Sequence, residues 1–266
     1  MRYPMEFQDK TMVITGAAGI FGGWTAAYFA KRGAKLCLSD IRMDALEKVA
    51  ADLNLDPATT LLHATELTSD ASMLDLVDLV RREWKAPDIL VNNAGIYTRF
   101  SLLDMELADW DRVFGVNLRA PFVLTREMAK LMIAEGKKGS VINISSGAAR
   151  KMNQNSVPYC TSKTAIERLS KGFAMELAHH GIRVNIVEPG FAPGSEVSAL
   201  DDAYVQNMLK NIPLGRASGP DDAPGAIAYL CSDQAAFITG AVLSVDGGNS
   251  IGNYKRPEPA APASAG

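Results

Sequence analysis

Apolar runs of strand length alternate with helical periodicity along almost the whole chain. Between these runs, apolar residues recur at helical spacing, as at Leu46, Val49, Ala50 and Leu53. Strand–helix alternation of this regularity predicts a parallel sheet with helices on both faces. We therefore expect a doubly wound α/β domain whose sheet has seven strands, at residues 10–14, 35–39, 61–64, 89–91, 141–144, 184–187 and 242–245.

No linker interrupts this alternation, so we expect one domain over residues 1–252. The one irregular insert, at about 190–213, predicts a mobile lid, although an ordinary surface loop fits the same pattern. The tail at 253–266 is rich in proline and alanine, a composition that predicts disorder.

Composition argues against several classes of partner. The 266 residues carry a net charge of −3 and contain no basic block, which argues against nucleic acid. No apolar run approaches the roughly 20 residues of a membrane-spanning helix. The N-terminus lacks the apolar stretch of an export signal. We therefore expect neither nucleic acid nor a membrane as a partner.

Cysteine and histidine usage predicts a reducing compartment and no metal site. Cys37, Cys160 and Cys231 are widely spaced and form no C-x-x-C pair. Such a sparse, odd set is typical of reduced thiols in a cytoplasmic protein. The three histidines do not have the spacing of metal ligands.

A glycine-rich loop at residues 15–22 follows the first predicted strand, and we expect a helix at 24–32 behind it. Glycine lets the chain turn tightly and lets a phosphate approach the backbone. The N-terminus of the following helix offers free N–H groups and a partial positive charge. The pattern predicts a pyrophosphate site, although an ordinary strand-to-helix turn has a similar composition.

Asp40 ends the second predicted strand, about twenty residues after the loop, where an adenosine ribose would present its hydroxyls. A carboxylate there favours NAD, because it would repel the 2′-phosphate of NADP. Arg42 lies two residues on and leaves an alternative open. It could bind that phosphate, or it could be a solvated residue at a helix start.

Tyr159 and Lys163 are four residues apart in a predicted helix at 159–178, so they share one helix face. A neighbouring ammonium favours the phenolate form of a tyrosine, which could then act as an acid or base. The alternative is an exposed helix pair without a chemical role. Ser145 and Ser146 end the fifth predicted strand on the same edge, where a hydroxyl could hold a substrate oxygen or simply cap a turn.

Asn117 lies on the apolar stripe of a long helix predicted at 107–133, where an unpaired amide is unfavourable. Pro121 follows four residues later and has no N–H to donate to the Asn117 carbonyl, so the normal helical hydrogen bond is absent. A water held at the freed carbonyl could link to Lys163. The alternative is a proline kink beside a buried, satisfied asparagine.

From residue 10 to about 248, the chain resembles the classical short-chain dehydrogenase/reductases, a family with a Rossmann-type fold. The resemblance implies that Ser146, Tyr159 and Lys163 are catalytic, that Tyr159 is the acid/base, and that Asn117 holds a water in a proton relay. The segments that carry it are 15–22, Asp40, 92–95, Asn117, Ser146, Tyr159 with Lys163, 189–190, 239–240 and 246–248.

The same resemblance implies a set of cofactor contacts. These are Gly16, Gly19, Ile20, Phe21, Gly22, Asp40, Glu66, Leu67, Asn93, Tyr159, Lys163, Pro189, Gly190 and Phe191. Three positions depart from the family pattern. Ile20 replaces the middle glycine of the loop, Glu66 replaces an aspartate beside adenine, and Gly194 replaces a threonine near the nicotinamide, with Ser195 as a possible substitute.

The resulting hypothesis is a cytoplasmic, NAD-dependent oxidoreductase that interconverts a secondary alcohol and a ketone. By resemblance it is a homotetramer or homodimer that pairs through the helices of Asn117 and Tyr159. Alternatives are a 3-oxoacyl-carrier-protein reductase and a catalytically silent dinucleotide-binding module. The predicted pocket mixes apolar groups with the cations Arg99, Arg150 and Lys151, so both a bulky apolar ketone and a small anionic one fit.

Overall fold

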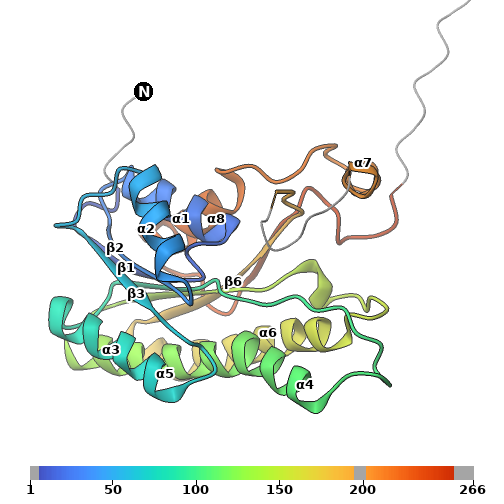
Figure 1. The fold of residues 1–266 in the computed structure, drawn as a ribbon. Helices are drawn as coiled ribbons and strands as arrows, with labels where there is room; N and C mark the ends of the chain where they lie inside the picture. Colours follow the sequence, from blue (N-terminus) through green and yellow to red (C-terminus); the bar gives the residue numbers. More distant parts are fainter. Residues whose placement is uncertain (1–5, 195–201, 255–266) are drawn as a thin grey trace, which may run out of the picture.

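Seven parallel strands form one sheet in the order β3-β2-β1-β4-β5-β6-β7 (Figure 1). The computed structural model describes residues 6–194 and 202–254. All seven predicted strands are confirmed, at β1 Thr11–Thr15, β2 Lys35–Asp40, β3 Thr60–Ala64, β4 Ile89–Asn92, β5 Ser140–Ile144, β6 Arg183–Pro189 and β7 Val242–Val245. The strand order reverses between β1 and β4, and ligands bind at such a point beyond the carboxyl ends of the strands.

Helices cover both faces of the sheet (Figure 1). On one face lie α1 Ile20–Ala30, α2 Met43–Asp52 and α8 Asp222–Cys231; on the other lie α3 Asp70–Trp84, α4 Leu107–Phe114, α5 Ala120–Ala134 and α6 Val157–Leu177. Each interface has its own apolar core, one around Phe29 and Ile227 and one around Met128 and Val184. Short 3₁₀ turns cover Gly147–Ala149, Ala178–His180 and Asp233–Ala235.

Helix α1 begins at Ile20, directly after Gly19, rather than at residue 24 as predicted. Gly22 therefore lies inside the helix and not in the turn. A Cβ built on Gly22 would overlap the Gly16 carbonyl and lie 2.7 Å from the Ala17 Cα. The missing side chain thus lets the first turn of α1 pack directly on the loop that precedes it.

The long helix predicted at 107–133 is divided by a π-helical turn, η1 Gly115–Arg119, between α4 and α5. The Ala120 N–H donates to the Gly115 carbonyl, five residues back. Pro121 accounts for the division, because its ring has no N–H to donate to Asn117 and would clash with that carbonyl in a regular α-helix.

The predicted insert contains a helix that the sequence analysis missed, α7 Asp202–Lys210. Residues 195–201, among them Ser195, lie outside the described part of the insert. Of the predicted tail, only Asn253 and Tyr254 are described. Within residues 6–194 and 202–254, no helix combines the length and apolarity that crossing a bilayer requires.

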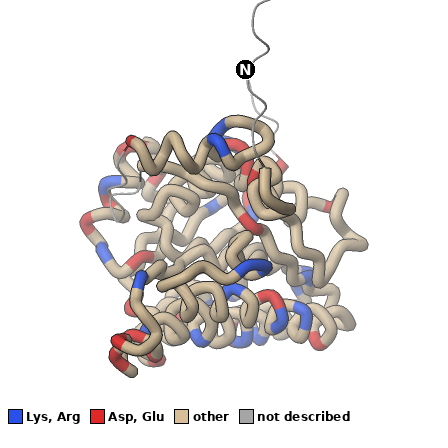
Figure 2. The backbone as a smooth tube through the Cα atoms, turned by 90° about the vertical axis from the view of Figure 1, so that its right-hand side faces the viewer, with Lys and Arg blue, Asp and Glu red and all other residues tan. Residues whose placement is uncertain are grey.

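Basic and acidic residues are interleaved along the helices of the α3–α6 layer in Figure 2. On this face of the described chain they form no continuous basic stripe, although a nucleic-acid-binding face needs one. Several of these charges pair locally, as Arg81 does with Asp78 and Lys130 with Glu127.

Candidate active site

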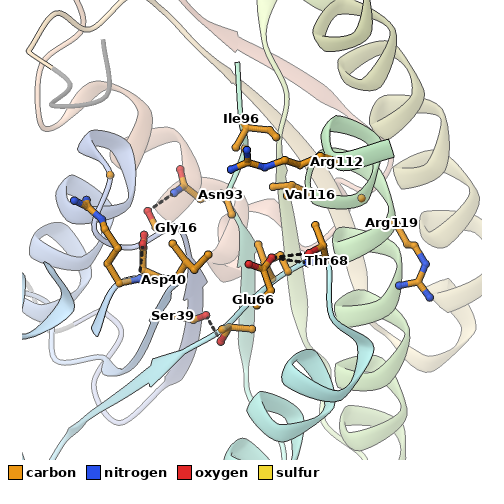
Figure 3. Close-up of a pocket in the computed structure, with 18 of the residues that line it drawn as sticks. Gly16, Ser39, Asp40, Glu66, Thr68, Asn93, Ile96, Arg112, Val116 and Arg119 are labelled. Atoms are coloured by element: carbon orange, nitrogen blue, oxygen red, sulfur yellow. Dashed lines mark hydrogen bonds between the residues drawn. The ribbon is translucent and has the colours of Figure 1, made fainter. Parts of the chain in front are cut away.

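A cavity of about 1130 Å³ runs along the carboxyl edge of the sheet, at the reversal of strand order (Figure 3). It begins beside Asp40 at the end of β2 and reaches Gly95 and Ile96 after β4. Most of the predicted cofactor residues line it, namely Gly16, Gly19, Ile20, Phe21, Asp40, Glu66, Leu67 and Asn93. The predicted loops therefore converge on one elongated space.

The glycine loop leaves backbone rather than side chains at the wall of this cavity. Gly16 has φ +62°, and a Cβ there would lie 2.7 Å from the Ala94 Cα. Gly19 is the N-cap of α1 and provides no side-chain cap, so the helix N-terminus at Ile20 and Phe21 faces the cavity. This combination of a tight turn and a helix N-terminus fits a pyrophosphate.

Asn93 fixes the loop from the side of β4. Its side-chain amide donates to the carbonyls of Thr15 at 2.9 Å and Gly16 at 3.0 Å. The Thr15 hydroxyl in turn accepts the N–H groups of Asn93 and Ala94, both at 3.1 Å. Asn93 also lines the cavity, so its predicted cofactor contact remains a prediction beside this structural role.

Asp40 is positioned by backbone donors. Its carboxylate accepts the N–H of Ala18 at 3.2 Å and that of Arg42 at 3.3 Å. Directly before it in β2, the buried Ser39 hydroxyl bonds to Thr65 at 2.8 Å. The Arg42 side chain is exposed but lines the same cavity, so the structure keeps both sequence-based interpretations of Arg42 open.

Glu66 accepts hydrogen bonds from Thr68, at 3.0 Å from the N–H and at 2.8 Å from the hydroxyl. The sequence analysis missed the opposite wall, which one face of α4 and η1 provides, with Arg112 and Val116 over the cavity (Figure 3). The residues of α4 and η1 that line the cavity recur at every fourth position, at 108, 112 and 116 and at 111, 115 and 119. This four-residue spacing can be read from the sequence, and it indicates that the residues of each set share one helix face.

Ser146 and Lys163 both neighbour Tyr159, and Lys163 lies behind Gly95, which lines the cavity. Burial raises the pKa of the Tyr159 phenol, and a hydrogen bond from Ser146 opposes this. The Lys163 Nζ lies 5.7 Å from the Tyr159 ring centre and donates to the Ile144 carbonyl at 2.8 Å. Burial lowers the pKa of Lys163 to about 8. A Cβ on Gly95, which lines the cavity, would lie 3.3 Å from this Nζ.

The raised pKa of Tyr159 corrects one expectation, because the sequence predicted that Lys163 would lower it. Desolvation is the largest contribution, since the phenol is enclosed by α6 and by the Tyr97 ring. The Lys163 ammonium is directed at the Ile144 carbonyl rather than at the phenol oxygen. The tyrosine is therefore neutral at pH 7 in this arrangement.

Asn117 is buried, and both the oxygen and the nitrogen of its side-chain amide make hydrogen bonds. The Oδ1 accepts the Ile96 N–H at 2.8 Å, and Nδ2 donates to the Ile96 carbonyl at 3.0 Å and the Ser162 hydroxyl at 3.1 Å. The expected pairing of a buried amide is thus present. Its predicted role in holding a water that links to Lys163 remains a prediction.

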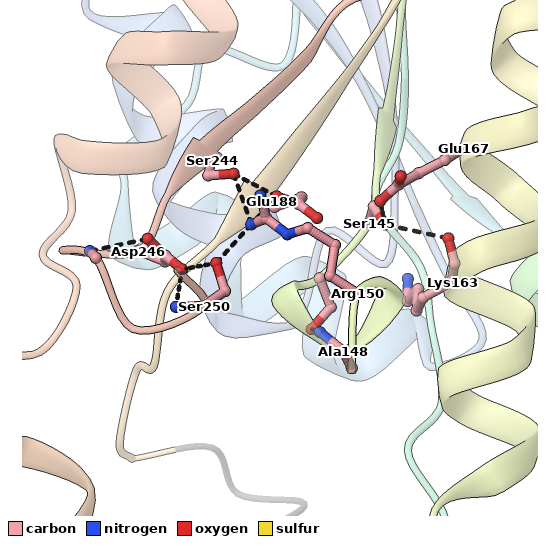
Figure 4. A network of polar contacts seen from close by, with 11 residues as sticks. Ser145, Ala148, Arg150, Lys163, Glu167, Glu188, Ser244, Asp246 and Ser250 are labelled. Atoms are coloured by element: carbon pink, nitrogen blue, oxygen red, sulfur yellow. Dashed lines mark hydrogen bonds and ion pairs between the residues drawn. The ribbon is translucent and has the colours of Figure 1, made fainter. Parts of the chain in front are cut away.

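Arg150 does not present a free charge to the pocket, which corrects the sequence-based expectation. Its Nη2 donates to the fully buried Glu188 carboxylate at 2.6 Å and to the hydroxyls of Ser244 at 2.8 Å and Ser250 at 2.5 Å (Figure 4). Ser250 also bonds to the Asp246 carboxylate. The guanidinium is therefore neutralised inside a polar network that joins the turn after β5 to the segment after β7.

Glu167 extends this network toward Ser145 and Lys163. The Ser145 hydroxyl lies 2.8 Å from the Glu167 carboxylate and 3.2 Å from the Lys163 carbonyl (Figure 4). Burial raises the pKa of Glu167, and the neighbouring Glu188 carboxylate raises it further, whereas Ser145 opposes this. Neighbouring carboxyl groups of this kind favour a shared proton.

The predicted cofactor contacts Gly22, Tyr159 and Lys163, and those at 189–191, are not among the residues that line the cavity of about 1130 Å³. Gly190 packs against the segment after β7, where a Cβ would lie 2.7 Å from the Asp246 Cα. Phe191 lines a separate cavity of about 500 Å³, together with Ile212 and Leu214. The contacts of these residues with a cofactor therefore remain predictions.

Comparison with known proteins agrees with this geometry. A family model described as enoyl-(acyl carrier protein) reductase matches residues 16–250. The chain is 33% identical to a 3-oxoacyl-[acyl-carrier-protein] reductase of Thermotoga maritima, over 92% of this chain and 99% of that protein. It is 31% identical to a galactitol 2-dehydrogenase of Agrobacterium fabrum, again over 92% and 99%.

Solved structures show the same fold. One is a putative NAD(P)-dependent gluconate 5-dehydrogenase from Beutenbergia cavernae with NADP bound at low occupancy, with a TM-score of 0.86 and 30% identity. The match covers 94% of this chain and 100% of that chain. The chain belongs to the short-chain dehydrogenase/reductase family. It is an oxidoreductase that acts on CH–OH groups with a nicotinamide dinucleotide.

Proposed function

We propose that the protein interconverts a secondary alcohol and a ketone with NAD as its cofactor. One observation supports this proposal: Lys163, which neighbours Tyr159, lies behind Gly95, and Gly95 lines the same cavity as Asp40. A dinucleotide bound with its adenosine ribose at Asp40 would place its nicotinamide toward the catalytic residues.

The catalytic residues have complementary roles in this proposal. Bound in the cavity, the nicotinamide would accept or supply the hydride. Tyr159 exchanges the proton with the substrate oxygen, which the Ser146 hydroxyl holds by a hydrogen bond. In ketone reduction Tyr159 donates, and the neutral phenol that burial favours is the form this step needs. Lys163 orients the nicotinamide ribose, and Asn117 holds the water of a proton relay.

Asp40 supports NAD over NADP. Its carboxylate is held in place by two N–H groups, so it cannot swing away from a phosphate without losing them. Two unit charges of the same sign at about 4 Å repel by roughly 4 kcal/mol at an effective dielectric constant near 20. Arg42, two residues on in the chain, is the candidate for offsetting that repulsion, and its side chain is exposed.

Turnover of a panel of secondary alcohols with NAD, followed by the absorbance of the reduced cofactor, tests the proposal. The panel should include polyols and hydroxy acids, and a 3-hydroxyacyl thioester covers the alternative of an acyl-carrier reductase. Oxidation of any secondary alcohol of the panel other than the thioester, whether a simple alcohol, a polyol or a hydroxy acid, supports the proposal. Turnover of the thioester alone would favour the alternative.

We further propose that one catalytic domain spans residues 1–252 and forms a homotetramer or homodimer in the cytoplasm. An apolar cavity of about 830 Å³ on the outer face of α5 and α6 supports the pairing. Phe114, Leu118, Phe122 and Leu169 line it. The free thiols Cys37, Cys160 and Cys231 support a reducing compartment. Light scattering of wild type and Phe122→Arg tests the pairing, and a wild-type monomer would refute it.

A further inference from the structure

The segment after β4 is fixed against the catalytic residues. The Ile96 backbone makes two hydrogen bonds with the Asn117 amide, at 2.8 and 3.0 Å. The next ring, Tyr97, meets the Tyr159 ring edge-on, with 4.8 Å between centroids and 86° between planes. The Tyr97 hydroxyl lies 2.9 Å from the Ser156 hydroxyl at the start of α6. Side chains just beyond Tyr97 therefore stand at a defined distance from the reacting centre.

Arg99 extends from this segment and lies between two phenols. Its Nε donates to the Tyr97 hydroxyl at 3.4 Å, and its Nη2 donates to the Tyr204 hydroxyl of α7 at 3.5 Å. The Arg99 Cζ lies 5.8 Å from the centre of each ring. The Phe191 ring packs edge-on against Tyr204 at 6.5 Å. The guanidinium is thus oriented by aromatic neighbours from two separate segments.

The charge of Arg99 is not neutralised by the part of the chain that the structure describes. Only the two tyrosines raise its pKa, and no carboxylate contributes. A guanidinium has five N–H donors, of which Arg99 uses two, so three remain for another acceptor. Arg150, the other arginine that the sequence assigned to the pocket, is bound to Glu188. Of the two arginines that the sequence assigned to the substrate pocket, Arg99 is therefore the one whose charge is available to a ligand.

We propose that Arg99 binds a carboxylate of the substrate, and that the enzyme therefore acts on oxo acids and hydroxy acids. This inference rests on the proposed alcohol–ketone chemistry of the same site. A guanidinium binds a carboxylate through two parallel N–H bonds, which gives orientation as well as affinity. Uncharged ketones would leave the positive charge without a partner.

The position of Arg99 also sets where the carboxylate lies in the substrate. The Tyr97 ring neighbours both groups: its centre lies 5.8 Å from the Arg99 Cζ and 4.8 Å from the centre of the Tyr159 ring. We therefore infer that the carboxylate lies several bonds from the carbonyl carbon. A 2-oxo acid, whose two groups are adjacent, is then expected to be too short to reach Tyr159 and Arg99 together. The preferred class is a ketone with a distal carboxylate.

Four ketones test this inference with the NADH-loaded enzyme. Three have six carbons, namely 5-oxohexanoate, 2-oxohexanoate and 2-hexanone, and the fourth is the methyl ester of 5-oxohexanoate, whose acyl chain has the same six carbons. We expect kcat/KM for 5-oxohexanoate to exceed that for its ester and for 2-oxohexanoate by at least about tenfold, mainly through KM, since a charge-assisted bidentate contact is lost. Arg99→Gln should reduce both ratios to below threefold, and Arg99→Lys should restore part of them. Arg81→Gln, which removes an exposed arginine of α3, should leave the ratios unchanged.

Binding of hexanoate, an unreactive acid, separates this inference from the proposed function. With NAD added, calorimetry should show hexanoate binding at least tenfold more tightly to wild type than to Arg99→Gln. Reduction of the ketones without an acid preference, or a preference that survives Arg99→Gln, overturns the carboxylate site and leaves the alcohol–ketone function standing. Arg99-dependent binding of hexanoate without turnover of any ketone supports the site and overturns the function.

Discussion

The two ends of the site are built by different means. At the cofactor end, backbone groups form the wall: Gly16 has a left-handed conformation, and Asp40 is held by two backbone N–H groups. At the substrate end, long side chains form the contacts, with Arg99 between Tyr97 and Tyr204. Gly16 packs main chain against main chain, and the Asp40 carboxylate accepts two main-chain N–H groups, whereas the two Arg99 hydrogen bonds join side chains and are near the limit of hydrogen-bond length.

Because the two ends are built differently, we expect cofactor choice and substrate choice to be able to change independently. A Cβ at Gly16 would meet main-chain atoms of Ala94, which cannot move aside without shifting β4. The side chains at the substrate end can be exchanged without moving the strands. We therefore expect substitutions at the cofactor end to alter cofactor choice and those at the substrate end to alter substrate choice, with the catalytic residues between them common to both.

Tyr159→Phe should have the largest effect, because it removes the proton carrier on which both ends depend. We expect kcat to fall by a factor of about 10² to 10⁴, the usual contribution of general acid–base catalysis. Binding of NAD should change little, since the ring remains. Tyr229→Phe, an exposed tyrosine on α8, is the matched control. A variant that retains more than a tenth of wild-type kcat would remove Tyr159 from the mechanism.

Arg150→Met tests whether the polar network behind the substrate end is structural. Glu188 is fully buried, whereas the Arg150 side chain is 42% exposed, so removing Arg150 leaves the carboxylate without its cation and costs at most about 3 kcal/mol of unfolding free energy. The double variant Arg150→Met, Glu188→Gln should recover at least half of that loss in urea unfolding at pH 8. A double variant less stable than the single one would show that Glu188 does not depend on Arg150.

Asp40→Ser should separate cofactor choice from substrate choice. Loss of the carboxylate removes the repulsion of a 2′-phosphate, and we expect the NAD preference to fall from at least 10²-fold, about 2.7 kcal/mol, to within a few-fold. The ratio of kcat/KM between substrates should stay the same. Asp44→Ser, with the same change in charge at the start of α2, is the control. A preference that persists in Asp40→Ser would mean that another group selects the cofactor.

Lys163 should give a pH-dependent contribution to stability. Burial lowers its folded-state pKa from 10.5 to about 8, so between these values the unfolded chain binds more protons and stability rises with pH. Relative to Lys163→Met, the unfolding free energy of the wild type should rise by about 2.5 kcal/mol from pH 7 to pH 10. Lys171→Met, on the exposed face of the same helix, should show no such rise. A constant difference across this range would contradict the low pKa.

The strands and the cofactor end could be predicted from the sequence because their signals are local. Apolar runs mark the strands, and Asp40 follows its strand directly. The start of α1 was predicted wrongly because residues 19–23 contain three glycines, a composition that is typical of a turn. Packing of Gly22 on the Gly16 carbonyl favours helix there instead. Helix α7 was missed although Val205, Met208 and Leu209 have helical spacing.

The substrate end could be predicted only in part because its contacts join distant segments. Arg150 bonds to Glu188 and Ser244, which are 38 and 94 residues away along the chain. The bond from Arg99 to Tyr204 spans 105 residues. No local pattern shows which of two arginines will be neutralised inside the protein. The sequence could name Arg99 and Arg150 as candidates, and only the fold distinguishes them.

The affinity of the wild-type protein for the two nicotinamide dinucleotides tests the account most directly, because it needs no knowledge of the substrate. Calorimetric titration with NAD and with NADP at the same ionic strength compares the two dissociation constants. We predict that NAD binds at least 10²-fold more tightly, which requires only about 2.7 kcal/mol of discrimination at Asp40. Dissociation constants within threefold of each other would show that Arg42 binds the 2′-phosphate and would contradict the assignment of NAD.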